Sequence, residues 1–214
     1  RVASLPITEL CLMDIDEQRL SIVGGFAQRM ARALGEPFKV TLSLNQREAV
    51  AGSSYIITQL RVGMMQARRG DEYLGQRHGL IGQETTGVGG MAKALRTIPV
   101  ILNLVKDIRE VAPNALLANF TNPAGLVTEM LTRYAADIPS VGVCNVGITT
   151  KMDMLAQYEK LTGEKIAEER AMLKTVGLNH LTWHYGFEVD GDEKWDEIFS
   201  AYLEELRQQD EPRP

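Results

Sequence analysis

The sequence is poor in cysteine and in positive charge. Its two cysteines, Cys11 and Cys144, are too few for a disulfide framework, which fits a cytoplasmic location best. The formal net charge is -5 at pH 7 and no basic stripe stands out, so nucleic acid is not an expected partner. No apolar run is long enough to span a bilayer and no signal peptide is recognisable, so we expect no membrane partner.

Internal repeats and low-complexity segments are also missing. Strand-like apolar runs alternate instead with helical patterns, which predicts an α/β fold with a doubly wound, Rossmann-like and mostly parallel sheet. Asn45 is expected to cap the second helix. Strands are predicted at 8–16, 38–43, 54–60, 116–120 and 140–145, and helices at 17–34, 46–51, 62–78, 91–111 with an interruption near Pro99, 122–136 and 148–162.

The last fifty residues or so follow a different pattern. Residues 175–191 alternate in the manner of an antiparallel strand or hairpin, and a helix is predicted over 195–208. We therefore expect two domains. Residues 1–165 would form a Rossmann-like domain, and residues 166–214 would begin an α+β portion.

The front of a dinucleotide-binding sheet is missing. Such a sheet opens with a strand, a glycine-rich turn and a helix, and an acid about 20 residues further on accepts the ribose hydroxyls. Asp14 is placed like that acid, yet no such turn precedes it. A capping or turn role for Asp14 stays open, and Asp16 competes for both roles. The later GVGG at 87–90 follows no strand, so it does not match the phosphate-binding fingerprint.

Three side chains with useful chemistry follow strand-like runs: Asn122, Cys144 and His180. In a doubly wound sheet the ligand crevice lies beyond the carboxyl ends of the strands. We therefore expect an amide, a thiolate donor and an imidazole to converge on one crevice, which favours an enzyme. Singly, the cysteine is more often a buried small residue and the histidine a core or turn residue, and a Cys–His pair suggests zinc or iron before manganese. The charged residues of 68–72 are interpreted as a solvated face.

Several short segments strengthen the enzyme interpretation because they occur together and in order. They are LPITELCLMDID (5–16), TQLRVGMMQARRGDE (58–72), GLIGQETTGVGG (79–90), ALRTIPVI (94–101), NFTNPAG (119–125), VGVCN (141–145) and GLNHLTW (177–183). Together they resemble glycoside hydrolase family 4, the NAD- and divalent-metal-dependent glycosidases, and in particular the 6-phospho-β-glucosidases. That family has its glycine-rich turn before the position of Arg1 and its catalytic tyrosine beyond Pro214. The resemblance therefore implies an internal fragment of a longer protein, in which residues 1–165 form a truncated NAD-binding Rossmann-like domain and residues 166–214 begin the α+β domain that binds substrate and metal.

The resemblance implies binding roles for the cofactor and the metal. Cys144 and His180 would ligate the metal, usually Mn2+ in this family. Asp14 would hold the adenosine ribose of NAD. Asn122 would contact the sugar and lie near the nicotinamide.

It also implies roles in substrate binding. Asn145 matches the β-specific members, and Glu84 would lie in the sugar pocket. Arg61 is the candidate for the 6-phosphate of the substrate, because a guanidinium fork suits a phosphate. The substrate would be a phosphorylated disaccharide or an aryl 6-phospho-β-glucoside, and the family commonly forms homo-oligomers.

The implied reaction is a redox-assisted elimination rather than the paired-carboxylate route. NAD takes a hydride from C3, the metal polarises the resulting ketone, a base removes the C2 proton, and the aglycone leaves from C1. Water then adds and the hydride returns to C3. No residue of this chain is assigned as the base, so we expect the fragment alone to have no turnover.

Two alternatives remain from the residues alone. A lactate/malate-type NAD-dependent 2-hydroxy-acid dehydrogenase has a sheet of this kind and needs no metal, but it leaves the Cys144–Asn145 pair unexplained. A non-catalytic α/β scaffold would bind neither metal nor sugar phosphate. A manganese requirement separates the glycosidase from both.

Overall fold

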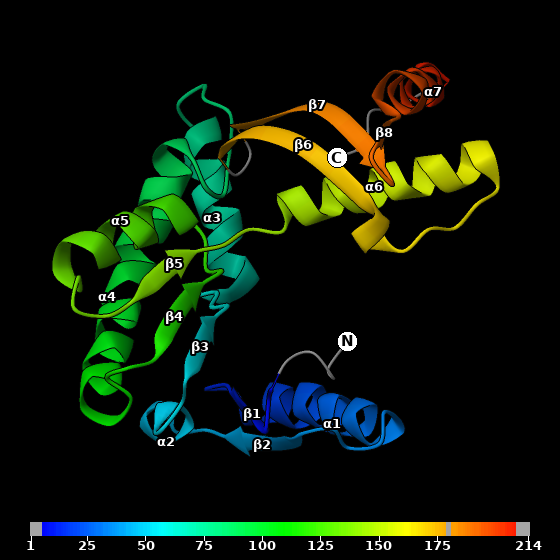
Figure 1. Ribbon diagram of the computed structural model, residues 1–214. Coiled ribbons are helices and arrows are strands. Elements are labelled where there is room, and N and C mark those ends of the chain that lie inside the picture. Colours follow the sequence, from blue (N-terminus) through cyan, green and yellow to red (C-terminus); the bar gives the residue numbers. More distant parts are fainter. Residues whose placement is uncertain (1–5, 179–180, 209–214) are drawn as a thin grey trace. The chain divides into compact units, whose positions relative to one another are not determined.

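The computed structural model describes residues 6–178 and 181–208 (Figure 1). Contacts within the chain divide it into two compact units, Arg1–Val143 and Cys144–Pro214. Parallel strands lie in the first unit and antiparallel strands in the second, as the sequence predicts. The domain boundary expected after residue 165 lies inside the second unit and stays a prediction.

The first unit contains two small parallel sheets. Strand β1 (Glu9–Met13) pairs with β2 (Lys39–Ser43). The other sheet has the order β3 (Tyr55–Thr58), β4 (Leu116–Asn119), β5 (Ser140–Gly142). In the doubly wound order 3-2-1-4-5-6, β2 and β1 correspond to strands 3 and 2, and β3, β4 and β5 correspond to strands 4, 5 and 6. Strand 1 is the member with no counterpart among the described residues, which agrees with the predicted incomplete front.

The first two helices of the first unit start at their predicted positions because local caps fix them. Asp16 accepts a hydrogen bond from Arg19 N at 2.9 Å, and Asn45 accepts one from Glu48 N at 3.2 Å. The helices are α1 (Glu17–Ala33), α2 (Gln46–Val50), α3 (Met64–Gln76), α4 (Gly87–Val111) and α5 (Ala124–Tyr134).

Helix α4 forms the centre of the first core. Its residues Ile101, Val105 and Ile108 are fully buried and belong to one apolar cluster with Leu117 of β4 and Leu131 of α5. Burial on this scale is the main source of stability for a helix that lies across a parallel sheet. The carboxyl ends of β3 and β4 are thereby held next to the helix.

The predicted interruption of α4 is wrong. The helix runs without a break through Pro99 and begins at Gly87, four residues before its predicted start at 91. Burial of the second half of the helix in this core, together with the packing of α4 against α3, offsets the hydrogen bond that proline removes. Among the described helices, α4 is the one that is long and apolar enough to cross a membrane, and 44% of its apolar stretch is buried within the protein. The core helix of a globular domain can have the same length and composition, and the burial of α4 in this cluster accounts for its apolar character.

The second unit is an antiparallel hairpin packed on two helices. Its core joins Met154, Phe187 and Ile198, and the predicted helix end at Gly163 is confirmed by a left-handed residue with φ of 74°. The hairpin expected over 175–191 is present and starts four residues earlier. Its elements are α6 (Val146–Thr162), the 3-10 turn η2 (Glu168–Arg170), β6 (Ala171–Leu178), β7 (Leu181–Val189), β8 (Asp192–Glu193) and α7 (Trp195–Arg207).

Candidate functional site

Glu84 is the centre of a cluster of opposite charges in the first unit. Its Oε1 accepts hydrogen bonds from Arg61 Nη1 at 2.5 Å and from Lys93 Nζ, and its Oε2 lies 3.2 Å from Arg68 Nη1. The Glu84 side chain is 15% exposed and that of Lys93 only 4%, whereas both arginines are 35% exposed. The cluster thus has a buried side, formed by the lysine, and an open side, formed by the guanidinium groups.

Glycines hold the loop that carries Glu84 tightly between α3 and α4. A Cβ at Gly82 would overlap the carbonyl oxygen of Glu72 in α3. A Cβ at Gly89 or Gly90 would overlap carbonyl oxygens of Gln83 or Thr85. The glycines of the GVGG segment therefore allow α4 to lie in close contact with the loop before it. The segment forms the first residues of α4 and follows a loop rather than a strand, as the sequence indicated.

The surrounding cations keep Glu84 ionised. Burial by itself would raise the pKa of Glu84, but hydrogen bonds from Lys93 and Arg61, together with their charges, outweigh burial and hold the pKa below its usual value of 4.5. A carboxylate in this state accepts hydrogen bonds and donates none. It can therefore orient the hydroxyl groups of a polar ligand.

The interpretation of 68–72 as a solvated face holds for Arg69, which is exposed, but is wrong for Asp71 and Arg68. Asp71 is 7% exposed and forms a two-point ion pair with Arg96, at 2.6 and 3.1 Å. Arg68 is half-buried, donates to Glu72 at 2.7 Å and also reaches Glu84. The segment looks solvated in sequence because its partners lie in the Glu84 loop and on α4.

A buried amide joins the carboxyl ends of β3 and β4. Asn119 Oδ1 accepts from Thr58 Oγ1 at 2.8 Å and from Thr121 N at 3.2 Å, and Asn119 Nδ2 donates to Thr121 O at 3.1 Å. Thr121 Oγ1 in turn accepts from Leu60 N at 2.8 Å. These bonds tie together the two segments that lead from the strands to Arg61 and to Asn122, so both predicted residues lie at the same edge of the sheet. Asn122 itself is exposed.

Asp14 and Asp16 have separate roles at the end of β1. Asp16 is the cap of α1, whereas the Asp14 carboxylate accepts two hydrogen bonds from Arg19, at 2.6 and 2.7 Å, and one from Asp16 N at 3.0 Å. The hydrogen bond from Arg19 is the main reason that the pKa of Asp14 is lowered. A carboxylate has about four lone-pair positions, so roughly one remains for a ribose hydroxyl.

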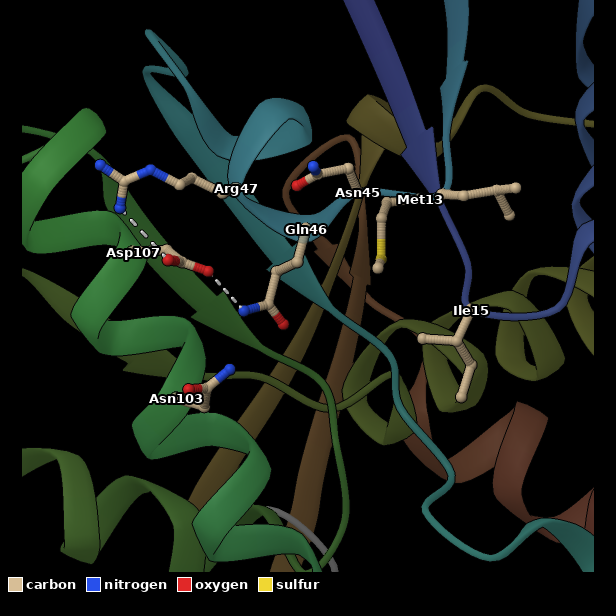
Figure 2. Close-up of a pocket in the computed structure, with 8 residues that line it drawn as sticks. Met13, Ile15, Asn45, Gln46, Arg47, Asn103 and Asp107 are labelled. Atoms are coloured by element: carbon tan, nitrogen blue, oxygen red, sulfur yellow. Dashed lines mark hydrogen bonds and ion pairs between the residues drawn. The ribbon is translucent and has the colours of Figure 1, made fainter.

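A cavity of about 460 Å³ lies at the carboxyl end of β1, beside Asp14 (Figure 2). Met13 and Ile15 line one side of it. Gln46 and Arg47 lie opposite, and both donate to Asp107 of α4, at 2.7 and 3.5 Å. This is the edge of a doubly wound sheet at which ligands bind.

Cys144, one of the two predicted metal ligands, lies in the second unit. Cys144 is half-buried, and its thiol lies 3.9 Å from Asn145 Oδ1 on the exposed turn that starts α6. His180 falls outside the described residues. The predicted convergence of its imidazole with the Cys144 sulfur therefore stays a prediction, as does a shared crevice with Asn122.

The described residues do not form a complete metal site. Within residues 6–178 and 181–208, no three His, Cys, Asp or Glu side chains gather to hold a metal ion. The Cys144 sulfur with the Asn145 amide oxygen beside it offers a soft and a hard donor on an accessible turn. That pair fits a metal only if a further ligand, such as His180, joins it.

Comparison with known proteins identifies the family. A model described as family 4 glycosyl hydrolase matches residues 1–160 of the 214.

The chain belongs to glycosyl hydrolase family 4.

Several curated relatives carry 6-phospho-glucosidase names. The chain is 43% identical over 203 residues to a probable 6-phospho-beta-glucosidase of Bacillus subtilis (strain 168), covering 94% of this chain and 45% of the relative. It is 39% identical to the 6-phospho-beta-glucosidase of Escherichia coli (strain K12), covering 94% and 44%. The 6-phospho-alpha-glucosidase 1 of Lacticaseibacillus paracasei is 31% identical over 85% of the chain. The chain thus spans less than half the length of the relatives it matches.

Solved structures agree with this family. The 6-phospho-beta glucosidase of Thermotoga maritima with manganese, NAD+ and glucose-6-phosphate has a TM-score of 0.82 at 34% identity, covering 98% of this chain and 48% of that one. A lactate dehydrogenase of Eimeria maxima has a TM-score of 0.58 at 12% identity, which shows a shared fold alone. The Rossmann-like fold expected from sequence is therefore confirmed for this family 4 chain.

The sequence analysis missed three polar residues of this site. Arg68 was placed on a solvated face, and Asn119 and Lys93 were not considered. The sequence does contain a sign of Asn119, because a polar residue inside the apolar strand-like run LLANF needs hydrogen-bond partners when it is buried. Lys93 carries none, because a lysine on a helix next to a glycine-rich segment is usually exposed.

Proposed function

We propose that the protein to which this family 4 chain belongs hydrolyses 6-phospho-β-glucosides with bound NAD and a divalent metal, Mn2+ being the first candidate. The observation that carries the proposal is the ionised Glu84 held among Arg61, Arg68 and Lys93, at the sheet edge where the loops to Arg61 and Asn122 meet. An open pair of guanidinium groups suits a phosphate, and a fixed carboxylate suits sugar hydroxyls. The same proposal places the protein in the cytoplasm as a homo-oligomer.

Each predicted residue then has a binding task. Arg61 takes the 6-phosphate, Glu84 accepts from sugar hydroxyls, and Asn122 contacts the sugar near the nicotinamide. Asn145 lies beside the β-configured sugar. Asp14 uses its remaining lone pair for the adenosine ribose, with Arg19 fixing its orientation.

The metal and cofactor supply the chemistry that side chains lack. NAD accepts and returns a hydride, and the divalent metal acts as a Lewis acid. Cys144 and His180 would hold the metal, and residues 1–165 would form the NAD-binding domain. The chain has no residue assigned as the base, so we expect residues 1–214 by themselves to show no turnover.

The test is a hydrolysis assay on the intact protein with p-nitrophenyl 6-phospho-β-glucoside, NAD and Mn2+. We expect release of p-nitrophenol that stops when the metal is chelated and returns when Mn2+ is added. The α-anomer and the non-phosphorylated glucoside serve as matched control substrates. Equal rates with and without the phosphate would contradict the role of Arg61, and turnover by residues 1–214 alone would contradict the inactive-fragment proposal.

A further inference from the structure

We infer that Lys93 is a positioning residue for the proposed glycosidase, a permanent buried counter-ion that keeps Glu84 ionised and aimed while Arg61 is released to an anionic substrate. The inference rests on the proposed function. It assigns different roles to the three cationic side chains that contact the Glu84 carboxylate. Arg61 and Arg68 face outward, and Lys93 faces inward.

Burial separates the lysine from the two arginines. Lys93 is 3% exposed as a residue, and its ammonium donates to Glu84 Oε1. Lysines are almost never buried this deeply unless they are paired. The guanidinium groups of Arg61 and Arg68 lie where an incoming anion can reach them, since each side chain is 35% exposed. A phosphate that draws Arg61 away therefore leaves Lys93 in place.

The helix holds the lysine in position. Gly89 and Gly90 bring the start of α4 against residues 83–85, which places Lys93 one turn further along the helix at the Glu84 carboxylate. Arg96, the next turn on, is fastened to Asp71 of α3 by the two-point ion pair, and α3 packs against α4 (Figure 1). Lys93 has little freedom to follow a departing Arg61.

The charge balance around Glu84 requires this lysine. The charged groups that face the Glu84 carboxylate are Arg61 from the segment after β3, Arg68 from α3 and Lys93 from α4, and Arg68 is shared with Glu72. Burial would favour the neutral acid if the neighbouring cations were lost. With Lys93 removed, Arg61 would have to serve the carboxylate and the substrate at once.

Lys93→Met, Lys93→Arg and Arg109→Met test the inference, with Arg109→Met as the matched control because it breaks an exposed ion pair of the same helix, with Asp137, away from Glu84. The first readout is the carboxyl titration of Glu84 by carbon-13 NMR in residues 1–214. The second is the acid limb of kcat/KM against pH in the intact protein. We expect Lys93→Met to move both midpoints upward by about one pH unit or more. Lys93→Arg should restore them, and Arg109→Met should leave the Glu84 midpoint in place.

Other outcomes would overturn the inference. One is an unchanged Glu84 titration in folded Lys93→Met. If Lys93→Met does not fold, Lys93→Gln is measured in the same way, and failure of both while Arg109→Met folds would make Lys93 a structural residue only. An intact wild-type protein without NAD- and metal-dependent hydrolysis would defeat the proposed function, yet the NMR titration would still decide the role of Lys93.

Discussion

Thr58 and Asn119 share a buried hydrogen bond of 2.8 Å between the carboxyl ends of β3 and β4. Both side chains are at most 3% exposed as residues. The bond lies where the chain leaves the two strands toward Arg61 and Asn122. It therefore links the core of the first unit to the edge at which we place the substrate.

We expect Thr58→Val to lower the free energy of unfolding by about 1–2 kcal/mol, because Asn119 Oδ1 keeps only the bond from Thr121 N. Asn119→Leu should cost more, about 3 kcal/mol, since it leaves several buried groups of Thr58 and Thr121 without partners. Urea unfolding followed by circular dichroism measures both. Thr41→Val, which removes an exposed hydroxyl bond to Glu9, is the control and should change stability by less than about 0.5 kcal/mol.

Glu84 should make the stability of this chain depend on acid pH. Its folded pKa lies below the usual 4.5, so its stabilising contribution is complete above pH 4.5 and is lost as the pH falls through the folded pKa. Glu84→Gln should therefore destabilise the chain at pH 7, by a cost on the order of 3 kcal/mol for a buried lysine left unpaired. The difference from wild type should shrink at pH 3. Unfolding midpoints at both values measure this, and a difference independent of pH would contradict it.

Asp14 and Asp16 allow cofactor binding to be separated from helix capping. Asp14→Ala in the intact protein should weaken NAD binding at least tenfold, since a hydrogen bond to a charged group contributes about 1.5–3 kcal/mol. Asp16→Ala removes the cap of α1 and should cost about 1 kcal/mol of stability with NAD affinity retained. Calorimetric titration with NAD gives the comparison. Equal losses of affinity in the two variants would argue against the ribose role.

The two cysteines provide a matched pair for the metal. Cys144→Ser in the intact protein should lower Mn2+ affinity at least tenfold, because a ligand sulfur is replaced by a weakly coordinating hydroxyl. Cys11→Ser lies in β1 and should leave the affinity unchanged. Electron paramagnetic resonance of free Mn2+ measures both. Wild-type affinity in Cys144→Ser would remove the thiolate from the proposed metal site.

Local patterns were enough for most elements of this chain. The Asn45 cap, the helix end at Gly163 and the hairpin of β6 and β7 depend on residues close together in sequence, and all appear as predicted. The family also follows from short segments kept in order, such as IGQETTGVGG and NFTNPAG, which can be recognised in the sequence without the fold. Such features need no knowledge of distant neighbours.

Burial of charge depended on the tertiary structure. Asp71 pairs with Arg96, Glu84 with Arg61 and Lys93, and each pair joins residues separated by at least nine positions. The same reason explains Pro99, since the core that keeps α4 continuous is built from β4 and α5. The sequence alone determined the order of strands and helices and the family, because these follow from local periodicity and short motifs. Only the fold decided which charged side chains are buried, because the desolvation that governs a lysine or a carboxylate comes from whatever segments pack around it.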